Sequence, residues 1–192
     1  MSDENLVWRA QTYALLARLL YSEPDQALLD NIAAIEVTEA ESPMGQQWVK
    51  LIEVAKQSNI AELHDAFQVL FIGVTHGELL PYGSYYQTGF LMEEPLAELR
   101  TDLAKLGLER QEKTAEPEDH IAAECDVMRL ILSAEGTPIV TAEEFYNHHI
   151  SPWFPAFFKD LAASKQHSFY SVLGELGEKF TELESRIYPK ST

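Results

Sequence analysis

Glu116-Pro117-Glu118-Asp119-His120, directly followed by the apolar-periodic run from Ile121 to Leu132, is the segment that shows most directly how this chain folds. Proline fixes the backbone φ angle near the first turn of a helix, and Asp119 is placed to accept a free backbone N–H there. His120 and Glu124 then share one helix face, one turn apart. Taken alone, this pattern indicates helix capping beside a solvated acidic face, so a functional interpretation depends on the other motifs of the chain.

Apolar residues recur at helical spacing along most of the chain, whereas strand-like alternation is nearly absent. We therefore predict an all-α fold, a single helical domain spanning residues 1–192 with about eight to ten helices. A long final helix is expected from Phe169 to Ile187. The clearest stripes are Tyr13, Leu16, Ala17 and Leu20; Trp48, Leu51, Ile52 and Ala55; Leu96, Leu99, Leu103 and Leu106; and Ile121, Cys125, Met128 and Leu132.

Helix starts carry their own signals, because short polar side chains accept the free N–H groups of a first turn. A Glu three residues after such a cap can bond back to the cap, which completes a capping box. The helix starts predicted in this way are Ser42-Pro43, Asn59 with Glu62, and Thr141 with Glu144.

Charge and composition exclude several classes of partner. The chain has 192 residues, 46% of them hydrophobic, and a formal net charge of −17, so it can bury one sizeable core but repels nucleic acid and anionic membranes. Basic peptides are attracted instead. The single cysteine, Cys125, is expected to serve as a small apolar core residue, and no segment has the form of an export signal or a membrane span. We therefore expect a cytoplasmic protein without direct membrane insertion.

A charged linker follows the Leu-rich stripe that ends at Gly107. It makes residues 107–117 a candidate hinge between two helical halves. Exchange of the C-terminal half between protomers at such a hinge is a low-cost route to a dimer, so we expect a monomer or a homodimer.

The segment from Gly73 to Gly89 reads as a long irregular connection that is apolar and aromatic. Connections of this length are usually functional or disordered, and this one is too rich in Tyr and Leu to be readily disordered. Its side chains are candidates for a groove wall, although a loop folded onto the core explains them equally well. The candidate wall comprises Leu79, Leu80, Tyr82, Tyr85 and Tyr86, beside Phe67, Leu70 and Phe71.

Taken together, these segments resemble the TorD/DmsD/NarJ family of all-helical cytoplasmic chaperones for molybdenum redox enzymes. The resemblance covers most of the chain, and the motifs are specific in combination. They are residues 13–20 with Pro24-Asp25, Phe67 to Gly73, Pro81-Tyr82-Gly83-Ser84-Tyr85-Tyr86, Glu116 to His120, then Phe145, His149, Trp153 and Phe169-Tyr170. Gly83 departs from the pattern, since it stands where a side chain is possible.

The resemblance implies a protein that binds the twin-arginine signal peptide, or another N-terminal segment, of a molybdopterin oxidoreductase precursor, and possible contact with its folded body. Such binding assists cofactor insertion and delays export. A leader of this kind offers arginines beside an apolar stretch, which suits carboxylates near an aromatic groove. The residues expected to bind peptide are Phe67, Leu70, Phe71, Pro81, Tyr82, Ser84, Tyr85, Glu116, Asp119, His120 and Glu124.

Two other functions fit parts of the sequence. A helical metal-dependent phosphohydrolase would use the His and Asp or Glu residues near positions 64, 119–124 and 148–149 as ligands, but adjacent helical residues point about 100° apart and an anionic substrate would meet an acidic surface. A generic adaptor that binds a partner helix is the third interpretation. His148 and His149 are expected to be solvated. The preferred interpretation is a non-enzymatic chaperone without a cofactor.

Overall fold

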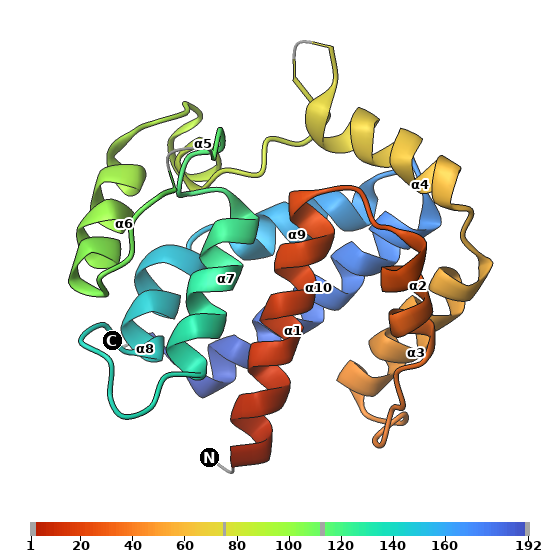
Figure 1. The fold of residues 1–192 in the computed structure, drawn as a ribbon, viewed down its shortest axis with the longest axis horizontal. Coiled ribbons are helices and arrows are strands. Elements are labelled where there is room, and N and C mark those ends of the chain that lie inside the picture. Colours follow the sequence, from red (N-terminus) through yellow and green to blue (C-terminus); the bar gives the residue numbers. More distant parts are fainter. Residues whose placement is uncertain (1–2, 75, 112–113, 191–192) are drawn as a thin grey trace. The chain divides into compact units, whose positions relative to one another are not determined.

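The computed structural model describes residues 3–74, 76–111 and 114–190, and it confirms the prediction of an all-α fold. Over this part of the chain there are ten α-helices, two short π-helical segments and a single isolated bridge in place of strands (Figure 1). Two residues of the candidate hinge, 112 and 113, lie outside the described residues, as do the first two residues of the amino-terminal segment.

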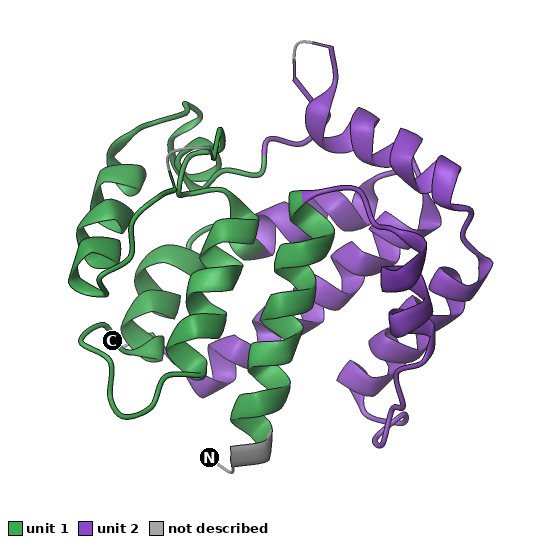
Figure 2. Ribbon diagram, in the orientation of Figure 1, with its two compact units in different colours: residues 1–21, 81–154, 190–192 green, residues 22–80, 155–189 purple. Residues whose placement is uncertain are grey.

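The chain forms two compact units, which Figure 2 distinguishes by colour. Unit 1 comprises residues 1–21, 81–154 and 190–192, and unit 2 comprises residues 22–80 and 155–189. Residues on both sides of the segment 107–117 belong to unit 1. The hinge at this segment therefore stays a prediction, and the division into units does not coincide with it.

Unit 1 is built around two packed helices, α1 and α7. They bury most of the stripes predicted from the sequence: Tyr13 and Leu16 of α1 and Cys125 and Met128 of α7 are buried, whereas Ala17 and Leu132 are half-buried. Burial also raises the pKa of the Cys125 thiol, as expected for a structural cysteine. The helices of this unit are α1 (Asp3–Tyr21), α5 (Gly83–Thr88), α6 (Glu94–Lys105), α7 (Ile121–Leu132) and α8 (Ala142–Phe145), which continues into η2 (Tyr146–Ile150).

Unit 2 is organised around α3, which packs against both α2 and the long α10. The predicted stripe of α3 is buried, including Trp48 and Leu51. The elements are α2 (Gln26–Ala33), α3 (Pro43–Gln57), α4 (Ile60–Phe67) with η1 (Gln68–Ile72), α10 (Ser168–Ile187) and α9 (Phe154–Ala163), whose first residue belongs to unit 1.

Two glycines of α10 allow a close approach of α9 that the apolar stripes do not indicate. A Cβ at Gly174 would clash with the backbone of Ala162, and a Cβ at Gly177 would clash with the ring of Phe158. Glycine in a helix interior costs stability relative to alanine, so its presence here is explained by the tight contact it permits.

The predicted helix starts are largely confirmed. The Ser42 side chain accepts the N–H of Gly45, and the capping box of Thr141 and Glu144 is present with both of its hydrogen bonds. Asn59 caps α4 as expected. The reciprocal half of that box was wrongly predicted, because the Glu62 carboxylate lies 3.8 Å from His167 Nε2 instead.

The sequence suggested that the connection from Gly73 to Gly89 is irregular throughout, and this was wrong for its second half. Its second half forms α5, and Gly89 ends this helix with a left-handed φ of 83°. Six residues are too few to show helical periodicity, so α5 cannot be predicted from the spacing of apolar residues. Across the described ranges, no helix combines the length and the apolar character needed to span a membrane.

Candidate functional site

The candidate site in unit 1 forms where the segment after Leu80 meets the segment before α7. The N–H of Gly83 donates to the carbonyl of Asp119 at 2.8 Å, and the N–H of Ile121 donates to the carbonyl of Pro81 at 2.9 Å. These two bonds make a reciprocal antiparallel bridge. Two motifs that lie far apart in the sequence, Pro81 to Ser84 and Glu116 to His120, are therefore joined into one structure.

Asp119 does not cap α7, which corrects the expectation from the sequence. Its Oδ2 accepts the N–H of Ser84 at 2.8 Å, so it caps the first turn of α5. The cap of α7 is His120, whose Nδ1 accepts the N–H of Ala122 at 3.2 Å. A carboxylate near the N-terminus of a helix is favoured by the free N–H groups and by the helix dipole, and here the tertiary contact decides which helix benefits.

His120 lies at the centre of this contact. It is buried, and burial lowers the pKa of its imidazole to about 4, against the opposing influence of Glu116 and Asp119. The ring is therefore neutral near pH 7, as its role as hydrogen-bond acceptor requires. Its ring centroid lies 5.3 Å from that of Tyr82 and 6.3 Å from that of Tyr21, both in edge-on arrangements.

Tyr82 connects the aromatic segment to the acidic motif through its hydroxyl, which donates a hydrogen bond to Glu116 Oε2. Partial burial and this carboxylate raise the pKa of Tyr82 above its ordinary value, so the hydroxyl remains a donor near neutral pH. Both side chains are half-buried. Glu116 is thus held against Tyr82 and is not a freely solvated charge.

Glu124 is also buried, and Trp153 Nε1 donates to its Oε2 at 3.1 Å. Burial raises the pKa of Glu124 well above its ordinary value, the negative charge of Asp119 raises it further, and the indole bond opposes both. A Cβ at Gly83 would lie 3.0 Å from Trp153 Nε1 and 3.1 Å from Glu124 Oε1. The site therefore leaves little room for a side chain at position 83. The expectation of a solvated acidic face is wrong for Asp119 and Glu124, because both are buried.

The other residues expected to bind peptide divide between the two units. In unit 1, Pro81 and Ser84 are buried while Tyr85 is exposed. In unit 2, Phe67 and Leu70 are buried, and Phe71 is half-buried with its ring 4.9 Å from that of Phe67 and 5.9 Å from that of Tyr170. The groove that would join the two sets stays a prediction.

Two contacts of unit 1 were missed. The bond from Trp153 to Glu124 was not predicted, because the two residues lie 29 positions apart and no local pattern in the sequence connects them. His149 was expected to be solvated but is buried, and its Nε2 lies 2.8 Å from Asp102 Oδ2. Burial lowers the pKa of His149, against the raising influence of Asp102. An i to i+47 pair leaves no local signal, so only the tertiary structure, which brings His149 of η2 beside Asp102 of α6, shows it.

The residues invoked for a metal-dependent hydrolase are dispersed. His64 and Asp65 belong to unit 2, where His64 Nε2 lies 2.8 Å from the carbonyl of Pro24. Glu124 and His149 belong to unit 1, and each is committed to the partner named above. Over the described ranges, no three His, Cys, Asp or Glu side chains are arranged to hold a metal ion.

Comparison with known proteins gives consistent similarities. A model of the family described as nitrate reductase delta subunit matches residues 38–159. Proteins named chaperone protein TorD are similar over most of their length: the one from Vibrio parahaemolyticus is 25% identical over 92% of this chain and 93% of its own. The one from Actinobacillus succinogenes is 27% identical over 91% and 93%.

A solved structure has the same fold. It is described as a redox enzyme maturation protein from Archaeoglobus fulgidus, and it aligns with a TM-score of 0.60 at 22% identity, covering 91% of this chain and 93% of that one. The similarity extends through both units, because the aligned share exceeds the length of either.

Proposed function

We propose that this chain, which belongs to the nitrate reductase delta subunit family of non-catalytic redox-enzyme maturation chaperones for molybdoenzymes, binds the twin-arginine leader or another N-terminal segment of a molybdopterin oxidoreductase precursor. Binding assists cofactor insertion and delays export until the client is complete. The protein acts in the cytoplasm. The residues proposed to form the peptide site are those predicted from the sequence. Buried members are proposed to position the site, and members with exposed surface are proposed to contact the peptide.

The observation that most strongly supports this proposal is the joining of the two motifs. The Glu116 to His120 segment holds Pro81 to Ser84 through two backbone bonds and the Asp119 cap, so it fixes the position of Tyr82 and of α5. The buried members of the set, among them Ser84 and Asp119, therefore position the site. Peptide contact in unit 1 falls to the members that keep some exposed surface, chiefly the half-buried Tyr82 and the exposed Tyr85.

The chemistry of the ligand matches this arrangement. An apolar stretch gains about 25 cal/mol for each Å² that it buries against aromatic side chains, which makes this contact the main source of affinity. Arginines of the leader are attracted to a chain of net charge −17. A single exposed arginine–carboxylate pair contributes about 1 kcal/mol or less, so it orients the peptide more than it tightens binding.

Affinity capture identifies the client. The full-length tagged chain is incubated with cytoplasm from the source organism grown with molybdate, and bound proteins are identified by mass spectrometry. Enrichment of a molybdopterin oxidoreductase precursor that retains its leader is the expected result. A Tyr82→Ala variant should capture less of it, whereas Asp126→Asn, at an exposed acid on α7, should capture the same amount.

Two results would contradict the proposal. Capture of an unrelated helical protein without any molybdoenzyme favours a generic adaptor. Capture of a client that binds equally well after removal of its leader places the contact on the folded body instead. Light scattering of the purified protein and of the complex then tests the proposed monomer or homodimer.

A further inference from the structure

The loop between α5 and α6 exposes three consecutive large apolar side chains. Phe90 is 70% exposed, Leu91 46% and Met92 73%. Tyr85, on the preceding helix, is 38% exposed. Single exposed apolar residues are common on protein surfaces, but a contiguous group of this kind marks an interaction site. Phe90, Leu91 and Met92 are called the 90–92 surface below.

The backbone of this surface is held in place. The N–H of Phe90 donates to Thr88 Oγ1 at 3.2 Å, and the N–H of Met92 donates to Ser84 Oγ at 3.1 Å. Met92 has a φ of 62°, the left-handed value that disfavours any residue with a side chain, and among the described residues it is the one such case outside glycine. The apolar side chains are thus presented by an ordered turn, which lowers the entropy lost when they bind.

The support of this surface leads back to the acidic motif. Ser84 accepts from Met92 with its hydroxyl, and its own N–H donates to Asp119. Ser84 is buried between the two. The same carboxylate that caps α5 therefore also anchors, through one intervening residue, the loop that carries the 90–92 surface.

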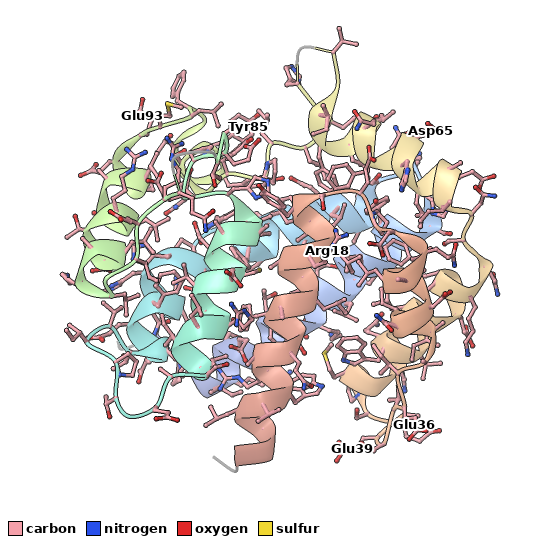
Figure 3. The ribbon with its side chains drawn as sticks, viewed as in Figure 1. Arg18, Glu36, Glu39, Asp65, Tyr85 and Glu93 are labelled. Atoms are coloured by element: carbon pink, nitrogen blue, oxygen red, sulfur yellow. The ribbon has the colours of Figure 1, made fainter. Side chains whose placement is uncertain are left out.

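Negative charge adjoins the apolar group. Glu93 and Glu94 follow Met92 directly and both are exposed; Glu93 is the N-cap of α6 and Glu94 is its first residue. Figure 3 labels Tyr85 and Glu93 at the same end of unit 1, one on α5 and the other at the start of α6. A partner that fits here carries apolar side chains next to positive charge. An anionic lipid surface or a second copy of this acidic chain would be repelled.

We propose that the 90–92 surface binds the apolar segment of the client leader, while Glu93 and Glu94 face its arginines. This inference rests on the proposed function, but it assigns the contact to residues that carry no motif of the family resemblance. It also predicts that the buried residues Ser84 and Asp119 act on peptide binding indirectly, by holding the loop that carries the 90–92 surface.

The test uses full-length protein and a fluorescent synthetic peptide with the sequence of a twin-arginine leader from a molybdopterin oxidoreductase of the source organism. The double variant Phe90→Ser/Met92→Ser should bind this peptide about tenfold more weakly or worse, because two exposed apolar contacts are lost. Ile139→Ser is the matched control, since Ile139 is 79% exposed in the same unit and should leave Kd unchanged. Urea unfolding of each variant verifies that the fold is intact.

A second pair of measurements tests the charged part. Glu93→Gln/Glu94→Gln should weaken binding at low salt and reduce its dependence on salt concentration. A peptide whose apolar segment is replaced by Ser and Gly should bind the wild type and the Phe90→Ser/Met92→Ser variant with the same low affinity, because the contact that distinguishes them is gone.

The outcomes separate the two proposals. Equal binding of the leader by wild type and the double serine variant overturns the role of the 90–92 surface and leaves leader binding intact. Absence of binding to every leader tested, with wild-type protein, overturns both. A serine variant that binds the leader normally but loses self-association in ultracentrifugation assigns the surface to a second copy of the chain and also overturns the inference.

Discussion

The carboxylate of Asp119 accepts a hydrogen bond from the backbone N–H of Ser84 at 2.8 Å, across 35 residues of sequence. Asp119 lies directly before the N-cap residue of α7 in the sequence, yet its side chain caps a different helix, α5. The bond is buried, and the second carboxylate oxygen, Oδ1, makes no protein hydrogen bond among the described residues. This side chain links the acidic motif, α5 and the loop that follows it.

Replacement of Asp119 by alanine removes this cap and leaves the N–H of Ser84 buried without its acceptor. The free energy of unfolding should fall by about 1–3 kcal/mol, as measured by urea denaturation. Asp126→Ala is the control on the neighbouring helix, because Asp126 is exposed and its ion pair with Arg129 is a surface pair of i, i+3 spacing. A surface pair of this kind contributes about 0.5 kcal/mol or less. Equal losses in the two variants would contradict the capping role of Asp119.

Protonation of His120 should make stability depend on pH. The folded-state pKa of about 4 lies below the ordinary value of 6.5, so the unfolded chain binds a proton that the folded chain does not as the pH falls between these values. Stability contributed by neutral His120 is present above pH 6.5 and is lost on acidification, by up to about 3 kcal/mol at pH 4.

The variant His120→Asn tests this dependence, because asparagine retains a side-chain acceptor for the N–H of Ala122 but does not titrate. Its unfolding free energy should fall less steeply than that of the wild type between pH 6.5 and 4. Glu124, whose pKa is raised by burial, has the opposite sign and loses its contribution as the pH rises, but it is present in both proteins. Parallel pH profiles would refute the assignment to His120.

Gly177→Ala distinguishes helix propensity from packing. Propensity alone predicts that alanine inside α10 stabilises the helix by about 1 kcal/mol. The added methyl group would overlap the ring of Phe158, so we expect destabilisation by about 1–3 kcal/mol instead. Ser185→Ala, at an exposed position of the same helix, should be neutral or slightly stabilising. A more stable Gly177→Ala protein in thermal unfolding would show that α9 can move away freely.

Tyr82→Ala should weaken binding of a client leader more than neutralisation of the exposed Asp126, because apolar contact contributes more to affinity than one solvated charge. Peptide titration by anisotropy gives both values. Leu70 was also expected from the sequence to bind peptide, which would make Leu70→Ala an equivalent test, but Leu70 is fully buried. That substitution should lower the free energy of unfolding by about 2–5 kcal/mol, so its effect on binding has to be compared at equal folded fraction.

Much of the fold follows from local pattern. The stripes of α3, α6 and α7 and the capping box at Thr141 depend on residues within one or two turns of each other, so their consequences can be derived without tertiary structure. The family resemblance likewise follows from short motifs. The six-residue α5 was missed because it is too short to show periodicity. The close contact made by the glycines of α10 was missed because the residues that require it lie on another helix, α9.

The candidate site was predicted as a set of residues, but not as an arrangement. Sequence spacing placed Asp119 at a helix start, and a helix start does benefit from it. Which one benefits depends on the bridge between residues 81–84 and 119–121, which no local rule contains. In the same way, Glu124 looked like a solvated acid until its position beside Trp153 made it a buried one.

The amino-acid sequence by itself determined the helical class, most helix boundaries, the acidic character and the membership of a chaperone family, because each of these depends on composition or on neighbours close in the chain. Tertiary structure alone decided which helix Asp119 caps, which carboxylates are removed from water, and that Phe90, Leu91 and Met92 stay exposed on an ordered turn. Burial and hydrogen-bond partnership are properties of the packed chain, since they depend on groups brought together from distant positions.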